Sequence, residues 1–132
     1  MKAGTEYWLV LSEYDWGTAR DMMKSKRYVY VVFMCHLSTE KLIKGAVVEF
    51  TDIAIPEKIH ALKRLADTAN LDLTDDQLVF LNNLTDQQAK TRYPEGIRNW
   101  GRAYTHAYAQ RILKQTEEFR EWLLPLIKSE KS

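Results

Sequence analysis

Residues 28–50 have the sequence YVYVVFMCHLSTEKLIKGAVVEF, whose pattern indicates the class of structure to expect for the whole chain. The opening residues, YVYVVFMC, are aromatic and β-branched and by local rules could form a buried strand. No turn signal interrupts residues 27–50, however, and an inner face continues at helical steps of three and four. That face comprises Phe33, Leu37, Glu40, Ile43 and Val47. One helix is therefore predicted, apolar on most sides and central in a bundle.

Helical signals continue on both sides of this segment. Residues 5–25 have helical spacing, with Thr5 as a candidate N-cap. After the central helix, Pro56 suits the first turn of a short third helix that ends near Asn70.

The second half of the chain predicts two further long helices. Thr74 and Gln77 form a capping-box pattern that begins one of them, and Pro94 ends it. Apolar residues from Tyr104 to Leu126 mark the last helix. The expected fold is all-α, an up-and-down bundle of four long helices plus one short helix.

The composition excludes several classes of protein. The chain has 132 residues, 45% of them apolar, enough for one domain with a core over residues 1–132. Only 5 glycines and 3 prolines, without Asn-Gly or Asp-Gly pairs, argue against a β-sandwich or barrel. Because the net charge is +1, any RNA contact must be a local patch. With no signal core and no apolar run near the ~20 residues that cross a bilayer, a cytoplasmic protein without membrane contact is expected.

Cysteine and histidine usage predicts a protein without a metal or cofactor. Cys35 is the only cysteine, which rules out a disulfide framework, and one Cys with three scattered His cannot make a closed zinc site. The apolar central helix and the tryptophans of the C-terminal half offer more apolar surface than one small bundle needs. A homodimer is therefore expected.

Polar residues on two predicted helices are candidates for chemistry. His36, Glu40 and Lys44 are four apart and lie along one helix face. They can supply a general base or a metal ligand, or they can form a buried polar seam. His60, near the start of the third helix, can contact a ligand or partner, or can bond to nearby backbone.

Arginine and aromatic residues are densest between residues 92 and 108, where Glu95 is the only acid. The cluster comprises Arg92, Tyr93, Arg98, Trp100, Arg102, Tyr104, His106 and Tyr108. Arginines can bind phosphate while aromatic faces stack on bases, so this segment is a candidate site for single-stranded RNA or a nucleotide. Alternatively, the aromatic residues belong to the core or to a dimer interface rimmed by arginines.

Four segments, taken in order, resemble the HEPN domain family. They are TEKLIKGAVVEF (39–50), IPEKIHALKRLA (55–66), TRYPEG (91–96) and the final amphipathic segment. The resemblance implies a helical fold over about residues 5–127. The branch of the family with an RYP sequence before the last helix, which TRYPEG resembles, is commonly encoded beside minimal nucleotidyltransferases. It implies an accessory subunit that binds a nucleotide or RNA while a minimal nucleotidyltransferase partner performs catalysis.

Under this interpretation the ligand-binding candidates come from three parts of the chain. They are Lys44, His60, Arg92, Tyr93, Arg98, Arg102 and Tyr108. A structural interaction module is another alternative, which would show no affinity for nucleotide or RNA at low salt.

HEPN ribonuclease toxins provide a further alternative. They resemble one another in an Arg followed by a polar residue, a short spacer and a His, often as His-x-Tyr. Arg98 with its following Asn resembles the opening, and HAY (106–108) resembles the ending. These toxins resemble one another in a spacer of four to six residues between the Arg and the His. Seven residues separate Arg98 from His106 and three separate Arg102 from His106, so each spacing lies one residue outside that range. His106 would transfer protons and an arginine would stabilise phosphorane charge, with Arg102 and His106 on one helix face.

Overall fold

A computed structural model describes residues 1–92 and 100–129, and every regular element within them is helical. The four long helices are α1 (Ala3–Lys24), α2 (Tyr28–Phe50), α4 (Asp75–Arg92) and α6 (His106–Ser129). The short ones are α3 (Leu62–Thr68) and α5 (Trp100–Ala103). The all-α class is confirmed. The predicted count of one short helix is wrong, because α5 forms a separate turn ahead of α6.

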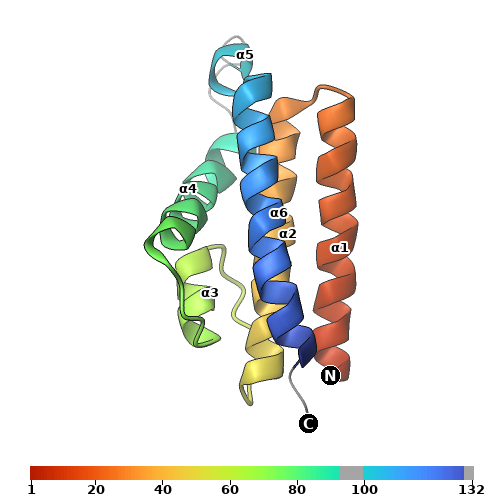
Figure 1. The fold of residues 1–132 in the computed structure, drawn as a ribbon, viewed down its shortest axis with the longest axis vertical. Coiled ribbons are helices and arrows are strands. Elements are labelled where there is room, and N and C mark those ends of the chain that lie inside the picture. The colour runs from red at the N-terminus through yellow and green to blue at the C-terminus, as the bar shows by residue number, and fades with distance from the viewer. Residues whose placement is uncertain (93–99, 130–132) are drawn as a thin grey trace.

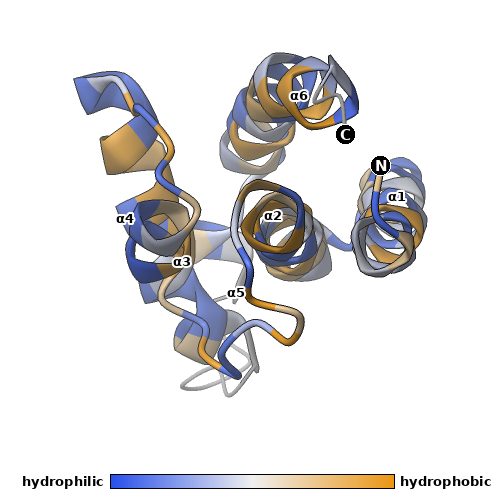
Figure 2. Cartoon of the chain, turned by 90° about the horizontal axis from the view of Figure 1, so that it is seen from below, coloured by the Kyte–Doolittle hydropathy of each residue, from blue (hydrophilic) through white to orange (hydrophobic). Residues whose placement is uncertain are grey.

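The long helices alternate in direction around α2. In Figure 1 the chain runs up α1, down α2, up α4 and down α6. Seen along the bundle in Figure 2, α2 is central, with α1, α6 and the α3–α4 pair around it. Accordingly, α2 contacts α1, α3, α4 and α6.

The core follows from the apolar character of α2. Its side chains Val31, Val32, Cys35, Leu42 and Ile43 are fully buried. A helix enclosed by neighbours can be apolar on most sides, which confirms the prediction of a central helix over residues 28–50. None of the described helices has the length and apolar character needed to cross a membrane.

The start of α1 differs from the prediction, because Thr5 is not its N-cap. Thr5 is buried inside the helix and its hydroxyl donates to Glu49 Oε1 at 2.8 Å. The backbone N–H of Lys2 donates to the same oxygen at 3.0 Å, and this hydrogen bond holds the pKa of Glu49 below its usual value. A carboxylate from α2 thus accepts hydrogen bonds at the start of α1, where backbone N–H groups have no acceptor within the helix.

The third helix begins at Leu62 rather than at Pro56, so His60 lies before it and not within it. The N–H of Leu62 donates to Thr85 Oγ1 on α4 at 3.2 Å. This long-range partner helps to fix where α3 begins, because the free N–H groups of a helix start need acceptors.

Local capping sets the starts of the last two long helices. Thr74 and Gln77 exchange two hydrogen bonds, of 2.9 and 3.1 Å, which confirms the predicted capping box of α4. α6 begins at His106, two residues later than expected. Thr105 Oγ1 accepts a hydrogen bond from the N–H of Tyr108 at 3.1 Å and acts as the N-cap.

Candidate functional site

The turn between α1 and α2 has a strained backbone. Lys26 has φ 63°, in the left-handed region that glycine usually occupies at helix ends. The N–H of Arg27 donates to Met22 O at 2.8 Å and that of Lys26 donates to Met23 O at 3.2 Å, the two bonds of a Schellman motif. A left-handed non-glycine residue costs roughly 1–2 kcal/mol. A cationic side chain therefore occupies a position at which glycine would make the folded protein more stable.

A pocket of about 270 Å³ lies between this turn and α5. Its lining residues are Lys26, Arg27, Tyr28, Val29, Tyr30, Gly101 and Tyr104. Lys26 and Arg27 are exposed, and Tyr30 keeps 43% of its surface accessible. The pocket therefore combines cationic groups with aromatic rings, the two features required for phosphates and bases.

His106 lies at the same end of the bundle. Its ring is perpendicular to that of Tyr28, with 5.6 Å between the ring centroids. His106 and Arg102 are both exposed. The expectation that they share one helix face is wrong, because α5 ends at Ala103 and the cap at Thr105 starts a new helix. They instead flank one short connection.

This end of the bundle is basic although the whole chain carries only +1. Residues 22–39 contain no Asp or Glu, and neither do residues 100–116. Lys24, Lys26, Arg27 and Arg102 are all exposed. We refer to residues 24–30 together with 101–106 as the basic end. An anion that approaches it meets several positive side chains.

The tyrosines at positions 104 and 108 have partners within the protein. Tyr104 is buried and its hydroxyl donates to Gln87 Oε1 at 2.7 Å, and burial, with Tyr108 nearby, raises its pKa. The Tyr108 hydroxyl accepts a hydrogen bond from Asn83 Nδ2 at 3.2 Å, and the Arg111 guanidinium lies 5.1 Å from its ring centroid. Tyr108 therefore joins α4 to α6, and Tyr104 joins α4 to the connection between α5 and α6. The role of Tyr108 in ligand binding stays a prediction.

The remaining candidates of this segment are only partly described. Arg92 is the last residue of α4, whereas Tyr93 and Arg98 lie outside the described residues. Their contribution to ligand binding also stays a prediction.

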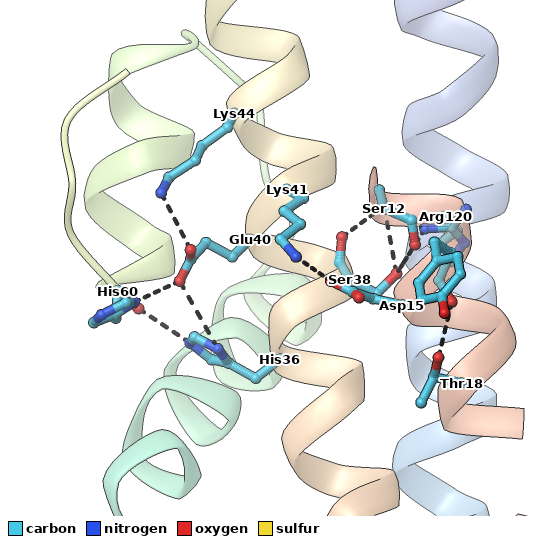
Figure 3. A network of polar contacts seen from close by, with 11 residues as sticks. Ser12, Asp15, Thr18, His36, Ser38, Glu40, Lys41, Lys44, His60 and Arg120 are labelled. Atoms are coloured by element: carbon cyan, nitrogen blue, oxygen red, sulfur yellow. Dashed lines mark hydrogen bonds and ion pairs between the residues drawn. The ribbon is translucent and has the colours of Figure 1, made fainter. Parts of the chain in front are cut away.

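A second cluster lies further along α2, where Glu40 is central (Figure 3). Glu40 is buried, and its Oε1 accepts a hydrogen bond from His60 Nδ1 at 2.8 Å while its Oε2 accepts one from Lys44 Nζ at 3.1 Å. The ammonium group of Lys44 also lies 5.3 Å from the ring centroid of Trp8. The predicted candidates Lys44 and His60 are thus brought together by a carboxylate that binds both.

The two histidines of this cluster differ in exposure. His36 is fully buried; its Nε2 donates to the carbonyl oxygen of His60 at 3.2 Å, and its Nδ1 lies 3.9 Å from Glu40 Oε1. The side chain of His60 is 47% exposed. Within the described part of the chain, no three His, Cys, Asp or Glu residues are grouped so that they could hold a metal ion. The contacts are those of a polar seam that attaches residue 60 to α2, with one imidazole open to solvent.

A third cluster, around Arg120, was not predicted. Its Nη1 donates to Ser12 Oγ at 2.7 Å and to Ser38 Oγ at 2.8 Å (Figure 3). Its Nη2 pairs with Glu13. Burial lowers the pKa of Arg120, although Glu13 opposes that shift. An arginine in an amphipathic segment looks like a surface residue, so its burial had no clear sequence signal.

The basic end also includes two cationic residues that were not predicted as site residues from the sequence. Lys26 and Arg27 lie at a helix junction, directly before the apolar run that begins at Tyr28. Their adjacency to aromatic residues was a usable signal, but only the folded chain brings them beside α5.

Comparisons with known proteins assign the family. No curated protein and no solved structure gave a significant match to this chain. A family model described as the HEPN domain matches residues 5–128, nearly the whole sequence. The all-helical bundle agrees with that assignment, and the chain belongs to the HEPN domain family.

Proposed function

We propose that this protein is an accessory subunit that binds a nucleotide or RNA and works with a minimal nucleotidyltransferase. The observation that carries the proposal is the pocket at the basic end, where Lys26 and Arg27 lie beside Tyr28 and Tyr30. Membership of the HEPN family is in keeping with a nucleotide- or RNA-related role.

The dimensions of the pocket favour a part of a nucleotide. Pockets for drug-sized ligands usually measure about 300–1,000 Å³, and this one, at about 270 Å³, is smaller. A phosphate held by Lys26 and Arg27, with one base or ribose against a tyrosine, fits this size. Further nucleotides of a strand would extend over the exposed side chain of Arg102.

Fluorescence anisotropy with a labelled single-stranded RNA at low salt tests the binding role. Arg27→Ala and Arg102→Ala should each weaken binding and lower the slope of log affinity against log salt by about one. Lys128→Ala is the matched control, because it removes the same charge from the last turn of α6 at the opposite end. Equal losses in all three variants would show general charge attraction and reject the basic end as the site.

The partner requires a separate test. The reading frame beside this gene should encode a nucleotidyltransferase with a Gly-Ser motif and paired aspartates, and the two coexpressed proteins should coelute in size-exclusion chromatography. Independent elution at tens of micromolar would contradict the accessory role but leave RNA binding intact.

A ribonuclease is the second candidate, favoured by the exposure of His106 and Arg102 on either side of one connection. An accessory subunit should leave single-stranded RNA uncut, and His106→Ala should bind RNA almost normally. Metal-independent cleavage that His106→Ala abolishes would instead establish the ribonuclease, since general acid–base catalysis contributes ~10²–10⁴ in rate. Absence of any RNA or nucleotide affinity at low salt would favour the interaction module.

A further inference from the structure

The outer face of α1 carries a regular apolar stripe. Its members follow one another at alternating steps of four and three: Ala3, Tyr7, Val10, Tyr14 and Gly17. The exposed fractions of Tyr7, Val10 and Tyr14 are 59%, 62% and 76%. This spacing is that of the seam between two coiled helices, which natural sequences use to pair helices.

The stripe is not needed by the bundle itself. α1 buries its opposite face, through residues such as Thr5, Ser12 and Ala19, and packs mainly on α2 with a smaller contact to α6. Figure 2 shows α1 at the edge of the bundle, with its outer side uncovered by any other described helix. Contiguous exposed apolar residues of this kind mark an interaction site.

We infer that a second copy of this chain covers the stripe, with the two α1 helices antiparallel. In the register that sets Val10 of one copy opposite Tyr14 of the other, Tyr7 lies opposite Gly17. An added Cβ on Gly17 meets nothing within 4 Å in the single chain, which leaves space for a tyrosine ring. Large side chains thus face small ones in successive layers, whereas a parallel pairing would oppose Tyr7 with Tyr7 and Gly17 with Gly17.

The charges beside the stripe select the same orientation. Glu6, Glu13 and Arg20 follow one another at seven-residue steps along one flank of the stripe. In the antiparallel register Glu6 of each copy lies near Arg20 of the other, which gives two attractive pairs. Glu13 lies near the symmetry axis, and its carboxylate already pairs with Arg120 of its own chain. The flank is therefore self-complementary in the antiparallel arrangement.

Sedimentation equilibrium tests the surface. The protein should be a dimer at tens of micromolar, and Val10→Glu should weaken dimerisation by roughly 100-fold, because it places a charge in an apolar seam. Val79→Glu is the matched control, since Val79 is 68% exposed on α4, and it should leave the dimer intact. A monomeric wild-type protein, or a dimer that Val10→Glu leaves unchanged, would overturn the inference. The far-ultraviolet circular dichroism spectrum of Val10→Glu should show the same helical content as that of the wild-type protein.

Disulfide formation tests the orientation without introducing a charge. A mixture of Val10→Cys and Tyr14→Cys proteins under mild oxidant should cross-link at 10–14 faster than Val10→Cys cross-links to itself. The buried thiol of Cys35 does not compete. Faster 10–10 linkage would overturn the antiparallel register, and absence of either linkage at dimer concentrations would reject α1 as the interface.

Discussion

Arg120 on α6 donates from Nη1 to Ser38 Oγ on α2 at 2.8 Å, across 82 residues of sequence. The same nitrogen reaches Ser12 on α1, and the two serines donate to each other's carbonyl oxygens at 2.7 and 3.0 Å. One guanidinium therefore links three helices through a network in which each hydroxyl has both a donor and an acceptor role.

Arg120→Ala should lower the free energy of unfolding by roughly 1.5–3 kcal/mol, the usual range for hydrogen bonds to a charged group. The loss stays at this level because the serines keep their carbonyl acceptors and Glu13 is 62% exposed, so that no charge is left buried. Urea unfolding measures the change. Glu117→Ala, on the exposed face of α6, should change stability by less than about 0.5 kcal/mol.

Lys26→Gly should stabilise the protein by about 1 kcal/mol, because glycine adopts the left-handed backbone of this turn without strain. The same change should weaken RNA binding. Lys26→Ala separates the two effects, since it removes the charge but keeps the strain, and it should weaken RNA binding equally without the gain in stability. Thermal unfolding and anisotropy on the three proteins measure both quantities, and a fall in stability for Lys26→Gly would contradict the backbone argument.

Glu49→Gln should destabilise the protein at pH 7 but not in strong acid. The hydrogen bond from the Lys2 N–H lowers the pKa of Glu49, so the folded state favours its ionised form. That stability is present above the ordinary glutamate pKa of about 4.3 and is lost as pH falls through the lower folded pKa. Urea unfolding across this range should show the two proteins converging. For Glu121→Gln, an exposed control, the difference from wild type should be small at every pH.

Cys35 should resist alkylation in the folded protein. Burial raises the pKa of its thiol to about 12, so at pH 8 the thiol stays in its protonated, unreactive form. Iodoacetamide followed by mass spectrometry should show no adduct in the native protein and full reaction in concentrated urea. Rapid labelling of the native protein would mean that α2 opens readily at this position.

Local rules predicted the elements whose partners are close in sequence. The capping box of Thr74 and Gln77 spans one turn, and the continuous pattern over residues 28–50 excluded a strand despite its β-branched residues. Predictions failed where the deciding partner is distant. Thr5 has Glu49 as its acceptor, 44 residues away, and the start of α3 at Leu62 is supported by Thr85 on another helix.

The candidate site was predictable to a smaller extent. The arginine and aromatic cluster near the last helix directed attention to one end of the bundle, where Arg102 and His106 are exposed. The sequence could not show that the turn at Lys26 and Arg27 lies beside α5, because that neighbourhood arises from the packing of α6, which follows α5, against α2. Nor could it show that Glu40 joins Lys44 to His60, since His60 is 20 residues further along the chain.

Helix α1 carries the stripe proposed for pairing and ends at the strained turn at Lys26. Its length therefore sets the distance between the two RNA-binding pockets of the proposed dimer. Two antiparallel copies, centred near residue 12, would set their Lys26 turns about 28 residues apart along the helix axis, or roughly 40 Å. The two pockets would then face opposite ends of the assembly, too distant for one mononucleotide to bridge. A single strand of sufficient length could engage both, and its second contact would gain from the high effective concentration created by the first.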